Sequence, residues 1–249
     1  MTLPLLSDPD RYALFLDFDG TLVALAPRPE DVRLDDAARQ ALERLFRPLG
    51  GALAIITGRD IAVIDGFLDP LRLPVAGVHG LTRRGADGRV HTREIEGFSA
   101  ARIEAALEPL LSVHPELLLE CKHGAVALHY RARPDLEPMC LAAMGQAAKD
   151  MPGTELKRGK MVIEVKVIAS DKGEAIKDFL AEPPFRGRVP VFAGDDVTDE
   201  DAFRLVNERD GISIKVADGE TCAAFRAAGT EAILAWLRET ADRFEGRKR

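Results

Sequence analysis

Short apolar segments alternate with amphipathic segments near both ends of the chain, and this alternation restricts the fold more than any other feature. The apolar segments YALFLD, GALAIITG, LPVAGVHG, RVPVFAGDD and DGISIKV are each typical of a buried strand. Segments with apolar residues at helical spacing lie between them, and LDDAARQALERLF at residues 34–46 is the clearest. Strands that alternate with helices form a parallel sheet covered on both faces. The chain therefore predicts an α/β fold with a doubly wound, Rossmann-like parallel sheet.

The middle of the chain breaks this alternation. FSAARIEAALEPLL and DLEPMCLAAMGQAAKDM predict helices, and each precedes a segment that is typical of a β-hairpin, ELLLECKHGAVALHYR and GTELKRGKMVIEVKV respectively. This order is that of a separate α+β domain. We therefore expect residues 98–168 to form a domain inserted into a core domain that comprises residues 1–97 and 169–249.

Composition and charge restrict the partners. The 249 residues carry a net charge of −7, which disfavours nucleic acid and anionic membranes as partners. No apolar run approaches the roughly 20 residues that span a bilayer, and no basic segment precedes an apolar one at the N-terminus. The cysteines Cys121, Cys140 and Cys222 are isolated, which favours a reducing compartment. We expect a cytoplasmic protein that is monomeric or weakly self-associating.

Polar residues follow the predicted strands at the points where those strands end. They are Asp17-Phe18-Asp19-Gly20-Thr21 after the first strand, Thr57-Gly58-Arg59 after the second, and GDDVTDE at residues 194–200. Lys172 stands at the start of a predicted helix. Ligands bind beyond the carboxyl ends of such sheets, so these residues are expected to meet in one pocket. Taken alone, Lys172 also fits a solvated surface position, and GDDVTDE also fits an acidic helix start.

A pocket with these residues suits phosphoryl transfer. Several carboxylates repel one another unless a cation intervenes, and oxygen ligands suit Mg²⁺. A cation flanked by Asp17, Asp195 and Asp196 would leave one carboxylate free to attack phosphorus. Lys172 and groups near Thr57 would neutralise the phosphoryl oxygens. Asp19 would protonate the leaving alkoxide and then activate water.

These motifs resemble those of the haloacid dehalogenase superfamily of phosphohydrolases. The resemblance implies that Asp17 is the nucleophile, that Asp19 is the acid/base and ligates Mg²⁺ through its carbonyl, and that Asp195 is a further metal ligand. It also implies that Thr57 holds the phosphate and Lys172 bridges nucleophile and phosphate. Asp196 and Asp199 would lie in the outer shell of the metal or orient Lys172. We expect Gly58 and Arg59, beside Thr57, to bind substrate.

The inserted domain lies where that superfamily carries a cap. Segments of this domain and of the core resemble the trehalose-6-phosphate phosphatases. LLLECKHGAVALHYR, GKMVIEVKVIASDKGEAI, GVHG and GDDVTDEDAF carry this resemblance. It implies that Glu120, Lys122 and Glu164 bind sugar hydroxyls, which carboxylates and an ammonium can do. The alternation of Glu164 with Ile163 and Val165 also fits a solvated strand face. His79 fits either a loop-shaping role or a substrate contact.

The function implied by this resemblance is Mg²⁺-dependent hydrolysis of trehalose 6-phosphate to trehalose and phosphate, with a sugar phosphate as the small-molecule partner. Three alternatives remain open. One is a phosphatase for another sugar phosphate, and the second is a phosphomutase, which shares the aspartyl-phosphate step. The third is a non-catalytic sensor of sugar phosphates, which would be expected to lack a catalytic acid. The chain has no P-loop, because GTELKRGKM has one residue too many between its glycines and Met161 where Ser or Thr is needed.

Overall fold

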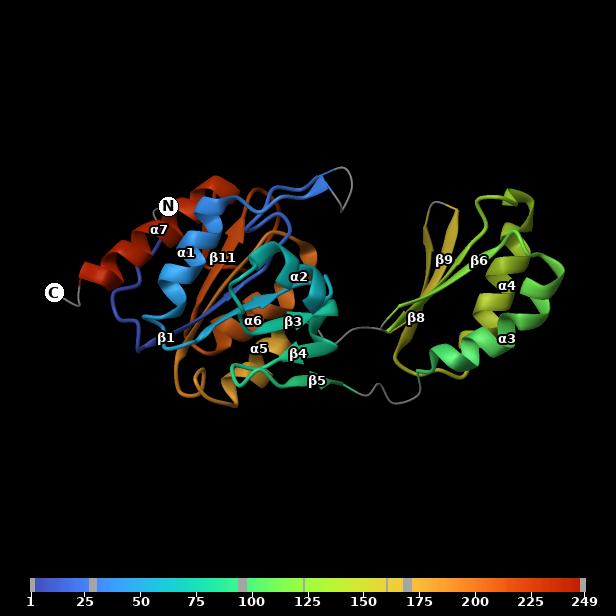
Figure 1. The fold of residues 1–249 in the computed structure, drawn as a ribbon, viewed down its shortest axis with the longest axis horizontal. Coiled ribbons are helices and arrows are strands. Elements are labelled where there is room, and N and C mark those ends of the chain that lie inside the picture. Colours follow the sequence, from blue (N-terminus) through green and yellow to red (C-terminus); the bar gives the residue numbers. More distant parts are fainter. Residues whose placement is uncertain are drawn as a thin grey trace. The chain divides into compact units, whose positions relative to one another are not determined.

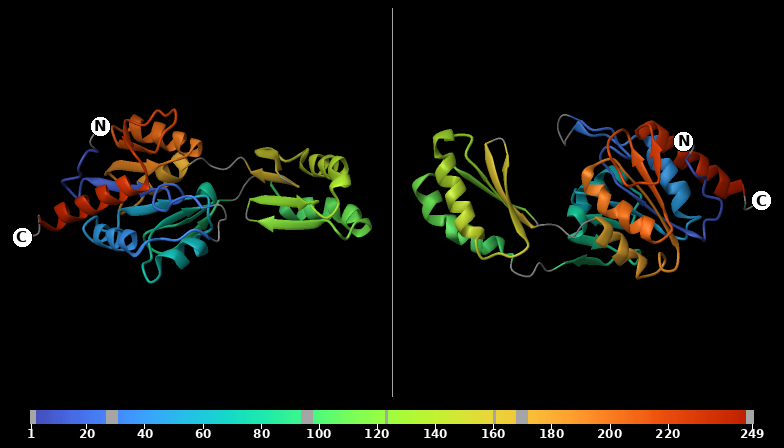
Figure 2. Two further views of the ribbon diagram at one scale, coloured as in Figure 1. Left: turned by 90° about the horizontal axis from the view of Figure 1, so that it is seen from above. Right: turned by 180° about the vertical axis from the view of Figure 1, so that it is seen from behind.

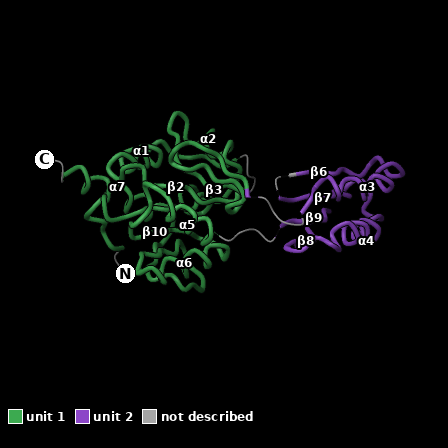
Figure 3. Tube along the Cα trace, turned by 90° about the horizontal axis from the view of Figure 1, so that it is seen from below, with its two compact units in different colours: residues 1–92, 170–249 green, residues 93–169 purple. Residues whose placement is uncertain are grey.

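An eight-stranded sheet lies at the centre of the larger of the two units into which the chain divides, residues 1–92 with 170–249 (Figures 1 and 3). The smaller unit comprises residues 93–169. The computed structural model describes residues 3–26, 31–93, 98–122, 124–159, 161–167 and 172–246.

The strands of the large unit lie in the order β12-β11-β10-β1-β2-β3-β4-β5. Those from β12 to β3 are parallel, while β4 and β5 extend the sheet as antiparallel strands. The doubly wound parallel sheet predicted from the sequence is confirmed. The strands are β1 Tyr12–Leu16, β2 Leu53–Ile56, β3 Val75–Gly77, β4 Thr82–Arg84, β5 Val90–Thr92, β10 Val189–Gly194, β11 Ile212–Val216 and β12 Phe225–Ala227.

Helices cover both faces of this sheet, which is why β1 and β2 are buried along their whole lengths. Helix α1 packs against α7, and α5 packs against α6, on opposite faces of the sheet (Figures 1 and 2). The N-cap Asp35 starts α1 by accepting a hydrogen bond from the N–H of Ala37. The helices are α1 Asp36–Phe46, α2 Ile61–Leu68, α5 Lys172–Leu180, α6 Glu200–Glu208 and α7 Thr230–Gly246.

Three short strands, β4, β5 and β12, were not expected from the sequence. Each has three residues, and those of β5 are all exposed. A three-residue segment is too short to show a period of two, and an exposed edge strand lacks the apolar run that marks a core strand.

The small unit is a four-stranded antiparallel sheet with two helices on one face. Its strands lie in the order β6-β7-β9-β8. Its core includes Ile103, Val126, Cys140, Met144 and Ile163, which come from both helices and from the two central strands. The elements are α3 Ala100–Val113, β6 Leu118–Lys122, β7 Ala125–His129, α4 Glu137–Ala148, β8 Thr154–Gly159 and β9 Val162–Val167.

Candidate active site

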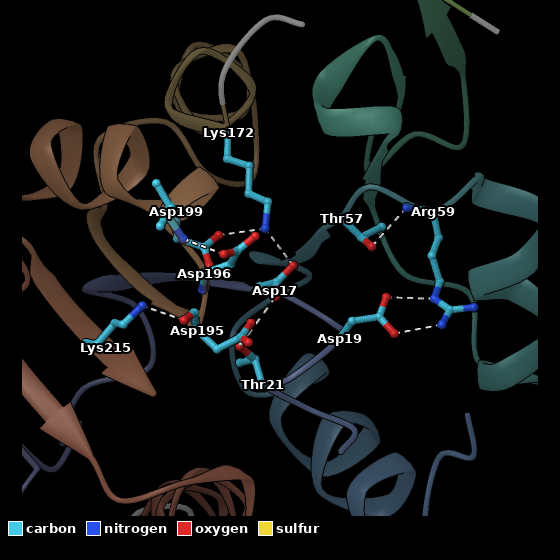
Figure 4. A network of polar contacts seen from close by, with 11 residues as sticks. Asp17, Asp19, Thr21, Thr57, Arg59, Lys172, Asp195, Asp196, Asp199 and Lys215 are labelled. Atoms are coloured by element: carbon cyan, nitrogen blue, oxygen red, sulfur yellow. Dashed lines mark hydrogen bonds and ion pairs between the residues drawn. The ribbon is translucent and has the colours of Figure 1, made fainter. Parts of the chain in front are cut away.

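The polar strand ends come together at one edge of the large sheet. Strands β10, β1 and β2 are parallel neighbours, so Asp195, Asp17 and Thr57, which follow them, lie at the same edge (Figure 4). Lys172 reaches this edge from the first turn of α5. A cavity of about 340 Å³ opens here, with Asp17, Asp19, Thr57, Gly58, Lys172 and Asp195 in its lining. Ligands of doubly wound sheets bind at this position.

The ammonium of Lys172 lies between two buried carboxylates. Its Nζ donates hydrogen bonds to Oδ1 of Asp17 at 2.7 Å and to Oδ1 of Asp199 at 2.6 Å. All three side chains are at most 6% exposed. Burial acts to lower the pKa of Lys172, but the charges of Asp17 and Asp199 outweigh it and raise that pKa above its ordinary value. Lys172 therefore stays charged and holds Asp17 in place.

The carboxylates around Lys172 outnumber it. Burial raises the pKa of Asp17 to about 8, against the lowering effect of Lys172, and the charge of Asp199 adds to the rise. Burial also raises the pKa of Asp195. One oxygen each of Asp17, Asp195 and Asp199 lies within 4.8 Å of the others. A divalent cation would relieve this excess negative charge, so the donor set fits a hard cation such as Mg²⁺.

Two glycines let the carboxylates approach so closely. A Cβ on Gly20 would lie 1.9 Å from Oδ2 of Asp195, and Gly20 has a φ of +78°, which residues with a Cβ rarely adopt. A Cβ on Gly194 would lie 2.4 Å from Cγ of Asp199. The acidic cluster therefore depends on glycine at both positions.

Asp196 lies at the exposed start of a 3₁₀ turn, Val197–Asp199. Its carboxylate accepts a hydrogen bond from the N–H of Val197 at 2.7 Å, and its own N–H donates to Oδ2 of Asp199 at 2.8 Å. This reciprocal cap fixes Asp199 for its contact with Lys172. Within the described residues, the carboxylate of Asp196 does not belong to the cluster formed by Asp17, Asp195 and Asp199.

Lys215 is a buried residue of this site that the sequence reasoning missed. It lies on β11, is 4% exposed, and its ammonium donates to the backbone carbonyl of Asp195 (Figure 4). A lysine within the apolar strand segment ISIKV was the available signal, because a charged residue in a strand covered on both faces needs a specific partner.

Asp19 points away from Asp17 and toward Arg59 (Figure 4). Nε of Arg59 donates to Oδ2 of Asp19, and Nη2 donates to Oδ1, both at 2.7 Å. The guanidinium carbon of Arg59 lies 5.9 Å from the ring centre of Phe18 and 5.5 Å from that of Phe67. Two parallel charge-assisted hydrogen bonds hold a carboxylate in one orientation. The sequence reasoning did not foresee this pair.

Thr57 and Gly58 form the turn after β2. The hydroxyl of Thr57 accepts a hydrogen bond from the N–H of Arg59 at 3.1 Å, and the carbonyl of Thr57 accepts one from the N–H of His79 at 2.9 Å. A Cβ on Gly58 would lie 2.7 Å from Nε2 of His79. Val78 and His79 have φ values of 49° and 54°, a costly region for a β-branched valine. A side chain at position 58 would therefore collide with the imidazole of His79, which also lines the cavity.

Glu120 and Glu164 lie in one row across the sheet of the small unit. Glu120 of β6 is opposite Ala127 of β7, which is in turn opposite Glu164 of β9. Two inter-strand spacings of about 4.8 Å therefore separate the two glutamate positions. Lys122 is the last residue of β6, and its side chain lies outside the described part of the structure.

Comparisons with known proteins are consistent along almost the whole chain. The family model described as "Trehalose-phosphatase" matches residues 15–230. The trehalose-6-phosphate phosphatase of Escherichia coli strain K12 is 40% identical over 240 residues, which cover 95% of this chain and 90% of the relative. The probable trehalose-phosphate phosphatase of Sinorhizobium fredii is 41% identical over 228 residues, which cover 90% and 84%.

Solved structures share the fold. The crystal structure of a trehalose-6-phosphate phosphatase related protein superposes with a TM-score of 0.69 at 29% identity, covering 95% of this chain and 99% of that one. The superfamily phosphatase BT1666 from Bacteroides thetaiotaomicron gives a TM-score of 0.57 at 15% identity, covering 94% and 95% of the two chains, which is a likeness of fold alone. Each helix within the described residues is too short or too polar to cross a bilayer.

Proposed function

This chain belongs to the trehalose-phosphatase family, and on that premise we propose that it hydrolyses trehalose 6-phosphate to trehalose and inorganic phosphate, a step of trehalose biosynthesis. The observation that carries the proposal is the buried contact of Asp17 with Lys172, with Asp195 beside them. A carboxylate that is held by an ammonium and faces a cation site is suited to attack a phosphate ester.

In the proposed first step, an oxygen of Asp17 attacks phosphorus. The bond between phosphorus and the sugar oxygen breaks, which leaves an aspartyl-phosphate and a sugar alkoxide that takes a proton from Asp19. Lys172 and the turn at Thr57 stabilise the negative phosphoryl oxygens. In the second step, Asp19 takes a proton from water as the water oxygen attacks phosphorus. Phosphate leaves, and the carboxylate of Asp17 is restored.

We propose that Mg²⁺ is the cofactor, held by carboxylate oxygens of Asp17 and Asp195 and by the backbone carbonyl of Asp19. When bound, it would supply positive charge beside the phosphoryl group. Asp196 could contribute only if its carboxylate left the N–H of Val197. The oxygen donor set and the raised pKa of Asp17, caused first by burial, support a cation here.

The role proposed for Asp19 requires it to leave Arg59. While both carboxylate oxygens accept hydrogen bonds from the guanidinium, Asp19 cannot hand a proton to a leaving group beside Asp17. We propose that Asp19 turns toward the substrate when a sugar phosphate enters. Arg59 is then released and, together with Gly58, contacts the substrate.

We propose that the large unit performs the chemistry and that the small unit recognises the sugar. Glu120 and Glu164 would accept hydrogen bonds from sugar hydroxyls, and Lys122 would donate to them. A site of this kind rejects ligands without those hydroxyls, because its own polar groups would be left without partners. The row formed by Glu120, Ala127 and Glu164 supports this assignment.

One experiment tests the substrate and the metal together. The purified chain is given trehalose 6-phosphate, other sugar phosphates and p-nitrophenyl phosphate, and phosphate release is measured with and without EDTA. Fast turnover of another sugar phosphate, with trehalose 6-phosphate ignored, would contradict the proposed substrate. A phosphomutase would yield a rearranged sugar phosphate in place of inorganic phosphate. A sensor would bind without turnover, and wild-type turnover by Asp17→Asn would exclude Asp17 as the nucleophile.

We also propose that the protein is cytoplasmic and is monomeric or weakly self-associating. All three cysteines are free thiols, which supports a reducing compartment. Light scattering on the eluted protein would test the second point, since a stable mass of two chains would contradict it.

A further inference from the structure

One face of the sheet in the small unit is left uncovered by α3 and α4, and we call it the open face. Successive strand residues point to opposite faces. Val126, Leu128, Ile163 and Val165 are buried against the helices. The residues between them therefore belong to the open face, which holds Glu120, Ala127, His129, Glu164 and Lys166.

His129 contacts Glu120 on this face. Nε2 of His129 lies 3.1 Å from Oε2 of Glu120, and the side chains are 34% and 44% exposed. The two residues are diagonal neighbours, because Glu120 is opposite Ala127 and His129 is opposite Leu118. Ala127 is small, so the imidazole reaches across the diagonal to the carboxylate without a larger side chain between them.

The contact has a defined direction. An ionised carboxylate can only accept hydrogen bonds, so Nε2 of His129 is the protonated nitrogen and Oε2 of Glu120 is the acceptor. The hydrogen bond restricts where Oε2 lies, and so limits the orientations in which Glu120 accepts further hydrogen bonds. A half-exposed pair of this kind adds little to folding stability. Its effect is therefore on the orientation of Glu120.

We propose that His129 is a positioning residue for sugar recognition, holding the carboxylate of Glu120 in the orientation that accepts hydrogen bonds from hydroxyls of the sugar. This proposal rests on the proposed function, in which Glu120 accepts hydrogen bonds from sugar hydroxyls. His129 touches neither phosphate nor Asp17 in the proposed reaction. Its loss should weaken sugar binding and spare the chemistry.

The test compares His129→Ala with the wild type on trehalose 6-phosphate and on p-nitrophenyl phosphate. We expect KM for trehalose 6-phosphate to rise about tenfold, the usual effect of losing one oriented hydrogen bond. We expect kcat/KM for p-nitrophenyl phosphate, which has no hydroxyls, and the melting temperature to stay unchanged. His129→Gln should restore most of the affinity, because its amide can donate from near the position of Nε2.

Two further variants make the result specific. In the double variant Glu120→Ala/His129→Ala, KM should equal that of Glu120→Ala alone, because His129 acts only through Glu120. His114→Gln is the matched control. It removes a histidine of the same unit at the end of α3, on the covered side of the sheet, and should change nothing.

The outcomes of these experiments distinguish a failure of the role proposed for His129 from a failure of the proposed phosphatase function. An unchanged KM in His129→Ala, or equal losses on both substrates, would overturn the role of His129 while leaving the phosphatase proposal intact. Additive losses in the double variant would also overturn it. Absence of trehalose 6-phosphate turnover in the wild type would instead overturn the proposed function, and the role of His129 with it.

Discussion

The guanidinium of Arg59 holds the carboxylate of Asp19 through two hydrogen bonds of 2.7 Å, on the side of Asp19 that faces away from Asp17. The proposed nucleophile is thus in place against Lys172, while the proposed acid/base is turned aside. In this arrangement Asp17 is already placed to attack phosphorus, whereas Asp19 is not yet placed to protonate the leaving group. Arg59 therefore influences the step in which the leaving group takes its proton.

The first prediction concerns Asp19. Asp19→Asn should lower turnover of trehalose 6-phosphate by about 10²–10⁴-fold, the usual contribution of general acid–base catalysis. With p-nitrophenyl phosphate, whose phenolate leaves without a proton, the same variant should release one equivalent of nitrophenolate and then stall. Stopped-flow absorbance measures this burst. Steady turnover of either substrate at the wild-type rate would contradict the assignment.

The second prediction concerns Arg59. Arg59→Lys should not restore the activity lost in Arg59→Met, because an ammonium lacks the planar pair of donors with which a guanidinium binds a phosphate or a carboxylate. Both variants should lower kcat/KM for trehalose 6-phosphate by about tenfold or more, because the Arg59 that Asp19 releases is proposed to make a charge-assisted contact with the substrate. Steady-state kinetics decide the point. Wild-type behaviour of Arg59→Met would contradict the proposed contact of Arg59 with the substrate.

The third prediction concerns the close approach of Gly20 and Asp195. In Gly20→Ala, the new Cβ would lie 1.9 Å from Oδ2 of Asp195 and displace it. We expect the Mg²⁺ concentration for half-maximal turnover to rise about 10–100-fold, as for disturbed metal ligands elsewhere. Gly187→Ala is the control, since Gly187 has the same φ of +78° but nothing within 4 Å of its Cβ position. An equal shift in both variants would trace the effect to backbone strain.

The fourth prediction concerns pH. Burial raises the pKa of Asp17 from 3.8 to about 8 in the folded chain, so folding retains a proton that the unfolded chain releases. The contribution of Asp17 to stability is therefore full below pH 4 and is lost as the pH rises toward 8. In EDTA at pH 8, Asp17→Asn should melt above the wild type, because Asn resembles the protonated carboxyl that the folded chain favours. The gap should shrink toward pH 4. Scanning calorimetry measures it, and a gap that widens on acidification would contradict the assignment.

Much of the fold was predictable because its signals are local. Apolar runs such as LAII of β2, and the helical spacing of Ala38, Ala41, Leu42 and Leu45, are visible in any short window. The rule that parallel strands present their carboxyl ends at one edge then brought Asp17, Thr57 and Asp195 together. Strand β5 was not predicted from the sequence, because its three exposed residues form neither an apolar run nor a periodic pattern.

The rest of the site depended on distances that no local pattern encodes. Arg59 lies 40 residues from Asp19 along the chain, and an arginine after a turn fits solvent as well as a carboxylate. The row of Glu120 and Glu164 required the register of two strand pairings, β6 with β7 and β7 with β9. The asymmetry between Asp196, which caps a turn, and Asp199, which contacts Lys172, follows from a few ångströms of loop geometry.

The position of β1 between β2 and β10 has a consequence for how the chain folds while it is being synthesised. Strand β1 pairs with β10, from Tyr12 with Val189 to Leu16 with Ala193. Because β10 follows the small unit in the sequence, this edge of β1 stays unpaired until the whole small unit has been synthesised. At ordinary translation rates the delay is on the order of ten seconds. Strands β6 to β9 pair only among themselves and can form as they emerge. During synthesis, the nascent chain can therefore hold a folded small unit while one edge of the apolar strand β1 is still unpaired, and unpaired strand edges favour association with other chains.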